Sequence, residues 1–498
     1  MVHHESYWNA TGPTSDYPAL ASEIEADVAI IGGGIFGVTT AAMLANRGLS
    51  VALVEARRIG EEVTGKSTAK VTSQHSLSYS DIEARFGADG ARLYGEANQT
   101  GVRTICDLAA RHGIACDLER KPAFVYATGE DEAERLEKEA VTARRLGLPA
   151  SLTGDAGLPF PIRTAMRFDD QAQFHPVKYV KGLAAELPAD KCRIFEQSRV
   201  TDWDPNRIAT EGGSVRARFV VMATHLPLGR TGGFFAENYP HMHAVMMGRA
   251  DPARVPDGMY ISVETPHRSM RGHRDEAGGA WMLFTGPTFK HGHVDQERAA
   301  FADLERFAAD TFGVSADYRW TNEDYRSMDH VPFIGRSSSR GDSVLVATGF
   351  NAWGISNGTV AAILIADLIE GRDNPWVSLF DATRIKPVAA AKEFVAGSAD
   401  VAKEMVGGYL ARKADSLAAL APGEAAICKV DGKNVAGYRD EAGALHAVSA
   451  VCTHLGCLVG WNETDRSWDC PCHGSRFDCD GGVIHGPAVT PLAAFRDA

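Results

Sequence analysis

Two short cysteine–histidine motifs near the C-terminus have residue types and spacing suited to metal binding. Five of the nine cysteines of the 498-residue chain lie between Cys452 and Cys479. Cys452-x-His454 is followed, after fifteen intervening residues, by Cys470-x-x-His473. Two thiolates and two imidazoles can hold zinc, although zinc sites usually pair cysteine with cysteine or place the two histidines together. One cysteine and one histidine from each loop suit a [2Fe–2S] cluster in which two histidines replace two cysteines on one iron, with zinc as the alternative.

The same stretch closely resembles the Rieske signature, because CTHLGC and CPCHGS both occur intact. The resemblance implies that the four residues above are the cluster ligands. It also implies a disulfide between Cys457 and Cys472 that clamps the two ligand loops. Such a disulfide is unusual in a reducing cytosol, and burial beside the cluster could protect it. The remaining cysteines are expected to be free thiols: Cys479, just outside the motif, and Cys106, Cys116, Cys192 and Cys428, which have no partner spacing.

Two positions after the second motif concern the reduction potential of the cluster. Hydrogen bonds to the cluster sulfurs raise that potential. Ser475 lies where the respiratory-type Rieske proteins have a serine hydroxyl for this purpose, but Phe477 stands where they have a tyrosine. One hydroxyl donor is therefore absent, and we expect a midpoint potential below that of the respiratory type. A redox titration that gave an equal or higher midpoint would reject this expectation.

A second cofactor motif lies near the N-terminus, in DVAIIGGGIFGVTTAAMLANRGLSVALVE. An apolar run predicts a strand that leads into Gly32-x-Gly34-x-x-Gly37, an Ala-rich helix and a second strand that ends in Glu55. Gly32 permits a tight turn, Gly34 lets the backbone approach a pyrophosphate, and Gly37 lets helix and strand pack closely. The helix N-terminus offers N–H groups to phosphates. Glu55 can accept hydrogen bonds from a ribose, which favours FAD or NAD over NADP.

Further along, SVLVATGFNAWGISNGTVAAILIADLIEG predicts a strand, a glycine-rich turn and a new helix. With the N-terminal motif, this unit makes residues 25–385 resemble the FAD-dependent oxidoreductases of the D-amino-acid-oxidase/glycine-oxidase type. In that family the late helix brings its N-terminus to the flavin, where the helix dipole would stabilise the negative charge of the reduced form. The resemblance implies FAD as cofactor. For Ser67 and Thr68 of the GKSTAK loop, the alternative is that they are ordinary loop hydroxyls that do not contact FAD. The implied FAD-binding residues are Gly32, Gly34, Ile35, Phe36, Gly37, Glu55, Ser67, Thr68, Val200, Gly349, Gly354 and Ile355.

The motifs and the two resemblances together imply an α/β protein: a Rossmann-like FAD-binding domain with an antiparallel-sheet substrate domain, plus a small all-β Rieske domain at the C-terminus. A chain of this length is too long for one core. We expect the FAD-dependent oxidoreductase over residues 1–385, a helical linker over 386–422 and the Rieske domain over 423–498. The FAD-binding parts are expected at about 25–80, 195–230 and 325–385, and the substrate part at about 81–194 and 231–324.

Composition limits the partners and the location of the protein. The formal net charge of −13 argues against nucleic acid or an anionic membrane as a partner. No apolar run approaches the ~18 residues that a membrane-spanning helix needs. The first residues, MVHHESYWNATG, lack a basic segment followed by an apolar one, so no signal peptide is predicted. We therefore expect a cytoplasmic protein without a membrane span.

Two cofactors with different electron stoichiometries predict the reaction. A flavin accepts two electrons together as a hydride, whereas a [2Fe–2S] cluster passes electrons singly. We expect oxidation of a C–N bond of a small-molecule amine or amino acid, with electrons passing from FAD through the cluster to an external one-electron acceptor, either a protein or a quinone. The family resemblance favours this direction, because its members mostly oxidise C–N bonds. The alternatives are an oxidase that returns electrons to O₂ and has a structural or regulatory Rieske domain, an NAD(P)H-dependent flavoprotein reductase, a Rieske oxygenase and a redox sensor.

Sequence features bear on three of these alternatives. Some oxidases of the family place a lysine beside the flavin on the strand that we match to AWMLFTG, and this segment contains no lysine. A reductase needs a second GxGxxG motif, but GRTGGFF at 229–235 lacks a strand–turn–helix context. An oxygenase needs a mononuclear iron held by two histidines and a carboxylate. The pairs His241/His243 and His291/His293 lack a convincing acid partner and are interpreted as satisfied or solvated side chains.

Three residues are candidates for substrate binding or catalysis. Arg271, which lies with Arg268 in TPHRSMRGHR, could clamp a substrate carboxylate bidentately, and surface arginines in a hairpin are the alternative. Tyr325 in NEDYRSMDH and His175 in QFHPVK are predicted to face the substrate pocket. A catalytic base is not required if the amine binds in its neutral form. An Arg271→Ala enzyme with unchanged KM for every accepted substrate would remove the clamp hypothesis.

Overall fold

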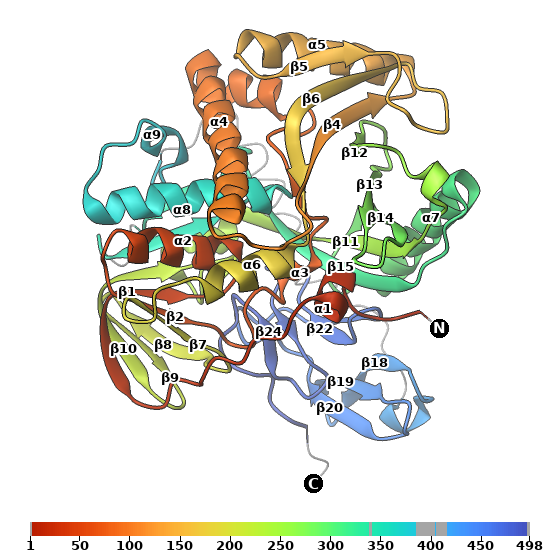
Figure 1. Ribbon diagram of the computed structural model, residues 1–498. Helices are drawn as coiled ribbons and strands as arrows, with labels where there is room; N and C mark the ends of the chain where they lie inside the picture. Colours follow the sequence, from red (N-terminus) through yellow and green to blue (C-terminus); the bar gives the residue numbers. More distant parts are fainter. Residues whose placement is uncertain (1, 338–340, 385–403, 405–415, 496–498) are drawn as a thin grey trace.

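The computed structural model describes residues 2–337, 341–384, 404 and 416–495 of the chain. These residues form two large sheets, of eight and nine strands, and two small sheets of three and four strands near the C-terminus. Figure 1 shows the small C-terminal sheets, in blue, lying against the lower side of the two large sheets. Among the described helices, none has the length and apolar character that crossing a bilayer requires.

The eight-stranded sheet is the Rossmann-like layer, with the order β16-β17-β10-β1-β2-β7 and a β8–β9 hairpin beside β10. Strands β7, β2, β1, β10 and β17 are parallel. Both faces of such a sheet are covered, which explains why the apolar run that ends β1 is fully buried. The strands are β1 (Glu23–Ile31), β2 (Val51–Val54), β7 (Cys192–Phe195), β8 (Val200–Asp204), β9 (Arg207–Thr210), β10 (Ser214–Met222), β16 (Phe333–Arg336) and β17 (Val344–Thr348).

Helices α2 and α8 follow the two glycine-rich turns of this sheet and pack against each other. They span Ile35–Asn46 and Gly354–Glu370. Gly371 ends α8 in the left-handed region, at φ 68°, a conformation in which glycine carries no Cβ penalty. The two turns therefore lie at the same edge of the sheet, where parallel strands end and helices begin.

The nine-stranded sheet has the order β15-β11-β14-β13-β12-β4-β6-β3, with β5 beside β6. Its pairs are antiparallel except for β12 with β4. The strands are β3 (Lys70–Val71), β4 (Glu119–Ala127), β5 (Ala150–Thr153), β6 (Thr164–Gln173), β11 (Asn238–Arg249), β12 (Met259–Ser262), β13 (Ser269–Arg274), β14 (Ala280–Phe289) and β15 (Tyr318–Ser327). The remaining helices are α1 (Tyr7–Thr11), α3 (Val63–Lys66), α4 (Ser78–Arg111), α5 (Glu130–Arg145), α6 (Pro176–Ala185), α7 (Val294–Phe312) and α9 (Val377–Phe380), with 3₁₀ turns η1 (Thr231–Ala236), η2 (Pro252–Arg254) and η3 (Leu417–Ala419).

The C-terminal part is all-β apart from η3. Its three-stranded sheet contains β18 (Ala425–Val430), β19 (Lys433–Arg439) and β20 (Leu445–Ser449), and its four-stranded sheet contains β21 (Gly460–Asn462), β22 (Ser467–Asp469), β23 (Arg476–Phe477) and β24 (Val483–His485). The predicted fold class is thus confirmed. The predicted helical linker, 386–422, lies largely outside the described residues. The predicted domain boundaries stay predictions, although β15 of the substrate sheet continues past residue 324 to Ser327.

Candidate active site and iron–sulfur centre

The two cysteine–histidine loops come together in the C-terminal part and leave a set of buried ligand atoms. Cys452 and Cys470 are 2% and 1% exposed. The rings of His454 and His473 have centroids 5.0 Å apart, and within the described residues their Nδ1 atoms are buried without a hydrogen-bond partner. Burial lowers the pKa of both histidines to about 4, so both imidazoles are neutral and able to ligate a metal. These donors fit a cluster with two thiolate and two imidazole ligands.

Neighbouring residues brace the two loops. Cys457 and Cys472 form a disulfide between them, as the resemblance implies. The Ser475 hydroxyl lies beside the ligand loops. Its oxygen accepts a hydrogen bond from the backbone N–H of Ala488 at 3.0 Å, and the hydroxyl is hydrogen-bonded to Cys452. The loops are therefore crosslinked, and one hydroxyl contacts a ligand sulfur.

The substitutions Ser475→Ala and Phe477→Tyr are expected to shift the midpoint potential of the cluster in opposite directions. Ser475→Ala removes a hydrogen bond to a ligand sulfur, and Phe477→Tyr offers a new one. A net hydrogen bond of ~0.5–1.5 kcal/mol corresponds to about 20–60 mV for a one-electron couple. Redox titration followed by visible spectroscopy should show a lower midpoint for Ser475→Ala and a higher one for Phe477→Tyr. An unchanged midpoint in both variants would contradict the tuning role of these positions.

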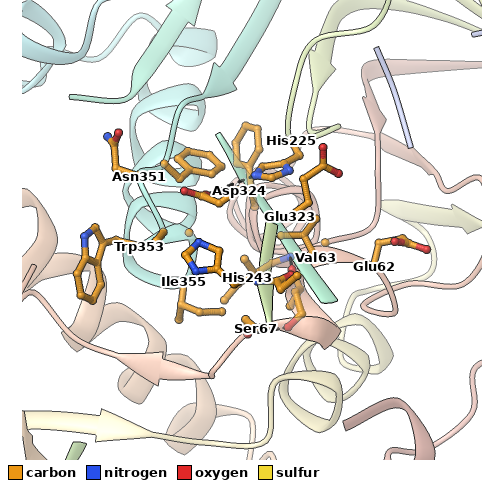
Figure 2. Close-up of a pocket in the computed structure, with 18 of the residues that line it drawn as sticks. Glu62, Val63, Ser67, His225, His243, Glu323, Asp324, Asn351, Trp353 and Ile355 are labelled. Atoms are coloured by element: carbon orange, nitrogen blue, oxygen red, sulfur yellow. Dashed lines mark hydrogen bonds and ion pairs between the residues drawn. The ribbon is translucent and has the colours of Figure 1, made fainter. Parts of the chain in front are cut away.

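A cavity of about 650 Å³ opens between the two large sheets and extends to the C-terminal part. Figure 2 shows Glu62, His225, His243, Glu323 and Asp324 around it. Ten of the twelve sequence-predicted FAD residues line this cavity: Gly32, Gly34, Ile35, Phe36, Glu55, Ser67, Thr68, Val200, Gly354 and Ile355. Gly37 and Gly349 are not among the lining residues. The cavity therefore joins the first glycine-rich turn, the GKSTAK loop and the start of α8 in one site.

The first glycine-rich turn has the geometry of a dinucleotide cradle. Gly32 has φ +108°, and a Cβ there would lie 2.4 Å from the Ala223 carbonyl oxygen. A Cβ on Gly37 would lie 2.0 Å from the Gly32 carbonyl oxygen, so Gly37 allows α2 to pack closely on the turn. Glu55 accepts the backbone N–H of Gly33 at 2.7 Å, which holds its carboxylate at the end of β2. These residues fit the pyrophosphate and ribose of FAD.

The second glycine-rich turn brings the N-terminus of α8 to the other end of the cavity. Asn351 and Ala352 adopt positive φ angles of 55° and 65°, and the turn 350–356 lines the cavity. Trp353 stacks on His75 with ring centroids 4.5 Å apart. The turn is therefore fixed by packing, and the positive end of the helix dipole faces the place where the resemblance puts the flavin.

None of the three candidate catalytic residues is among those that line the cavity, which argues against the predicted role of Tyr325 in the substrate pocket as well as those of Arg271 and His175. Arg271 is 0% exposed, and its guanidinium donates to the carbonyl oxygens of Thr68 at 2.7 Å and Phe174 at 3.0 Å. It also lies over the Trp8 ring. His175 begins α6, where its Nδ1 accepts the Lys178 N–H. Neither side chain lines the cavity, which argues against both predicted roles.

Tyr325, the third candidate, faces the Rieske loops. It is fully buried, and its hydroxyl donates to the backbone carbonyl oxygen of the cluster-ligand residue His473 at 3.0 Å. Its own carbonyl oxygen accepts the N–H of Asn351 at 3.1 Å. Asn351 belongs to the turn that lines the cavity. Tyr325 therefore connects the turn before α8 to a ligand of the cluster.

Strand β15 is a wall shared by the cavity and the Rieske part. Asn322, Glu323, Asp324 and Arg326 line the cavity. On the same strand, Thr321 donates its backbone N–H to Asp465 at 3.1 Å, and the Tyr325 hydroxyl contacts His473. The cavity and the Rieske part therefore both contact this strand. The arrangement separates the cavity from the cluster ligands by a single strand.

Several cavity residues were not predicted from the sequence. Lys70 lines the cavity, donates to the Tyr260 carbonyl oxygen at 2.6 Å, and burial lowers its pKa to about 7. His243 also lines the cavity, and burial lowers its pKa to about 4. Arg268 lines it too, although its guanidinium forms a bidentate ion pair with Asp303. The period-2 pattern of β11 and β15 was the available signal, but it does not say which face meets a cavity.

The interpretation of the four histidines as satisfied or solvated side chains agrees with the hydrogen-bonded His291 and His293, although both have acid partners, and not with His241 and His243. His291 is buried and has an acid partner, because its Nε2 lies 3.1 Å from Glu323 Oε1. His293 lies 3.2 Å from Glu404. Among the described residues, His241 and His243 each have an Nε2 that is buried without a hydrogen-bond partner. The sequence separation between His291 and Glu323 concealed this acid partner.

The GRTGGFF segment covers the cluster-ligand histidines. It forms η1, which has no preceding strand–turn unit of the dinucleotide-binding kind. Phe235 makes edge-to-face contacts with His454 and His473, at 5.1 and 5.2 Å between centroids. Gly229 donates its N–H to the Pro487 carbonyl oxygen at 2.9 Å. The segment is therefore a docking surface for the Rieske loops.

The hairpin between β21 and β22 anchors the Rieske part to the larger unit. The Asp465 Oδ2 lies 2.8 Å from the Nζ of Lys66, the residue before Ser67 in the GKSTAK loop. Glu297 in α7 accepts the N–H groups of Glu463 and Thr464 at 3.0 and 2.8 Å. These contacts are buried or half-buried, and they hold the cluster domain in one position against the cavity wall.

The Glu297 contact is expected to make stability depend on pH. Burial raises the pKa of Glu297 from 4.5 to about 7. The folded state therefore binds more protons than the unfolded state between these values, and this group's contribution to stability falls as pH rises across that window, by up to ~3 kcal/mol. Thermal unfolding between pH 4.5 and 7.5 should show a flatter profile for Glu297→Gln than for the parent. Glu134→Gln, at an exposed position, is the control, and equal slopes in all three proteins would contradict the prediction.

Comparison with known proteins identifies the larger unit. The model of the FAD dependent oxidoreductase family (DAO) matches residues 27–368. The chain belongs to this family. The Rieske [2Fe-2S] domain model matches residues 409–496. The protein is thus a FAD-dependent oxidoreductase with a C-terminal Rieske domain, and its cofactors are FAD and a [2Fe–2S] cluster, as the two motifs predict.

Individual relatives share all or part of this architecture. A protein of Bacillus subtilis (strain 168) named as a Rieske 2Fe-2S iron-sulfur protein, YhfW, is 35% identical over 493 residues, which cover 98% of this chain and 97% of the relative. Gamma-glutamylputrescine oxidoreductase of Escherichia coli (strain K12) is 26% identical over 388 residues, 74% of this chain and 89% of the relative. The crystal structure of glycine oxidase from Geobacillus kaustophilus has a TM-score of 0.59 at 21% identity, and covers 72% of this chain and 99% of that one.

Proposed function

We propose that the protein is a dehydrogenase that oxidises a C–N bond of an amine or amino acid and delivers the electrons singly to an external acceptor, a protein or a quinone, by way of the Rieske domain. The observation that carries the proposal is the shared wall: Tyr325 on β15 contacts a cluster-ligand residue, and the neighbouring positions of β15 line the FAD cavity. When bound, FAD accepts a hydride from the substrate carbon, and the cluster takes electrons one at a time. A short wall between them suits transfer within one chain.

The chain's own residues supply groups that can bind an amine or an amino acid. Asp324 has a buried Oδ2 that lacks a hydrogen-bond partner among the described residues and lines the cavity, so it can accept a substrate N–H. Arg326 lines the same cavity, and its positive charge suits a substrate carboxylate. Glycine oxidase is the name of one structural neighbour and gamma-glutamylputrescine oxidoreductase that of one relative, and both names agree with a nitrogen-containing substrate.

An oxidase is the second candidate, because a lysine does line the cavity. Strand β14 contributes Thr285, Gly286 and Thr288 to the lining, whereas the lysine is Lys70 from β3. Its amine is held by the Tyr260 carbonyl oxygen. Some oxidases of the family have their lysine on the strand that we match to AWMLFTG, in β14, whereas Lys70 is on β3. The absence of lysine from AWMLFTG therefore still favours a dehydrogenase.

The experiment that tests the proposal is an anaerobic screen of amines and amino acids against the fully loaded protein. A substrate should bleach the flavin band, and the cluster should then be reduced, as followed by its visible and EPR signals. The rate of re-oxidation of the reduced protein by air is then compared with its rate of re-oxidation by oxidised cytochrome c. A flavin that is reduced while the cluster stays oxidised, with rapid re-oxidation by air, would support the oxidase instead.

The Tyr325 contact gives a sharper prediction. Tyr325→Phe keeps the ring but removes the hydrogen bond to the His473 carbonyl oxygen, and we expect reduction of the cluster to slow by about two- to tenfold, the equivalent of ~0.5–1.4 kcal/mol. The rate of flavin bleaching by substrate should not change. Stopped-flow spectroscopy separates the two steps. Tyr79→Phe, another buried tyrosine that contacts neither Rieske loop, is the control, and equal cluster-reduction rates in all three proteins would contradict a role for this contact.

A further inference from the structure

A second set of potential metal ligands lies outside the cluster loops, where three parts of the molecule meet. His225 follows β10 of the Rossmann-like sheet, Glu323 belongs to β15 of the substrate sheet, and His485 ends β24 of the Rieske part. One ligand atom from each side chain lies within 4.8 Å of those of the other two. Figure 2 shows His225 and Glu323 close together at the cavity wall.

The three side chains are buried and their polar atoms are not satisfied. Glu323 is 2% exposed and His485 is 9% exposed. Within the described part of the chain, His225 Nδ1, Glu323 Oε2 and His485 Nε2 are buried without a hydrogen-bond partner, and Glu323 Oε2 lies 3.6 Å from His485 Nε2. Buried polar atoms without partners are rare in folded proteins. All three side chains also line the cavity, so they meet where a bound group can reach them.

The surroundings orient the carboxylate and supply negative charge. His291 lies 3.1 Å from Glu323 Oε1, which leaves Oε2 free to face the two other histidines. A histidine or carboxylate behind a ligand is the usual outer partner in metal sites. Asp324 adds a second carboxylate, with Oδ1 3.7 Å from His225 Nε2. The negative charge of two neighbouring carboxylates would be balanced by a divalent cation.

We propose that His225, Glu323 and His485 bind one divalent transition-metal ion, separate from the [2Fe–2S] cluster. Two imidazoles and a carboxylate suit Zn²⁺, Fe²⁺ or Mn²⁺ rather than Ca²⁺ or Mg²⁺, which take mainly oxygen ligands. Because the ligands come from the loop after β10, from β15 and from the Rieske part, the ion ties the cluster domain to the wall of the flavin cavity. His291 is a positioning residue that holds the carboxylate.

The test measures zinc in the protein loaded with FAD and cluster. The background is Cys479→Ser, because His446, Cys479 and Asp480 form a separate group of potential ligands at the protein surface. After equilibration with Zn²⁺ and removal of free metal, elemental analysis should find one zinc per chain beside the cluster iron. Glu323→Gln and His485→Gln, which preserve side-chain size, should each lose this zinc. His291→Asn should weaken zinc affinity by about 10- to 100-fold.

His330→Ala is the matched control, because His330 lines the same cavity but pairs with Asp81 outside the proposed site; this variant should keep the zinc. Iron and flavin content show whether each variant is folded. As a second readout, Zn²⁺ should raise the unfolding temperature of the parent but not of Glu323→Gln. The proposal is overturned if the parent binds no zinc, or if Glu323→Gln and His485→Gln retain as much zinc as the parent. If FAD alone occupied the ligand atoms of His225, Glu323 and His485, the parent would bind no zinc.

Discussion

Replacement of Cys452 by serine is expected to remove the [2Fe–2S] cluster and to uncouple the flavin from the external acceptor. Cys452 is 2% exposed and supplies one of two thiolates in a loop held by the Cys457–Cys472 disulfide. Loss of an outer partner of a metal ligand typically costs ~10- to 100-fold in affinity or activity, so loss of a ligand should cost more than ~100-fold in turnover with a one-electron acceptor. Substrate should still bleach the flavin, because the FAD cavity is built from other elements.

Three measurements check this result: iron content, the anaerobic rate of flavin bleaching, and the rate of cytochrome c reduction. Cys479→Ser is the matched control, because Cys479 lies just after the second loop but is not part of the ligand set. It should retain iron and turnover. A Cys452→Ser protein that lacks iron but reduces cytochrome c at the parent rate would show that the cluster is not in the path.

Replacement of Gly37 by valine is expected to abolish FAD binding. A Cβ at this position would lie 2.0 Å from the Gly32 carbonyl oxygen and 3.3 Å from the Ala223 Cβ, and valine adds two methyl groups to that contact. Helix α2 would have to move away from the turn that holds the pyrophosphate. Overpacking of a tight contact costs ~1–3 kcal/mol or more, and the displaced turn no longer presents its N–H groups to the phosphates.

The ratio of flavin to protein absorbance, together with the unfolding temperature, measures this effect. Gly48→Ala provides the control, since Gly48 has φ +92° but a Cβ there meets no atom within 4 Å. That variant should lose some stability through backbone strain and should keep its flavin. A Gly37→Val protein with a full complement of FAD would contradict the close-packing role of this glycine.

The sequence located both cofactor motifs because each depends on local spacing. Gly32, Gly34 and Glu55 lie in one strand–turn–helix–strand unit, and the cluster ligands lie in two short loops. The family resemblance supplied the predicted FAD residues that lie far from the first motif, and ten of the twelve predicted residues line one cavity. The substrate residues were harder to predict. Arg271 lies on a strand that is buried on both sides, so its guanidinium donates to backbone carbonyl groups rather than to a ligand.

Tyr325 illustrates why a strand pattern was not sufficient. Strand β15 lines the cavity with residues from both sets of alternate positions, Glu323 among them, and it also contacts the Rieske part through Thr321 and Tyr325. The period of two therefore indicates which residues share a face and not what that face contacts. The same ambiguity concealed Lys70 and His243, which line the cavity from β3 and β11.

The sequence by itself determined the cofactors and the order of the two units, because these follow from short motifs whose residues are close along the chain. Only the tertiary structure decided how the units meet. It placed β15 between the FAD cavity and the Rieske loops, turned Tyr325 toward His473, and brought His225 from the loop after β10 together with Glu323 of β15 and His485 of β24. The physical reason is that packing between distant segments depends on which faces of each element are buried together, and local sequence periodicity does not specify that choice.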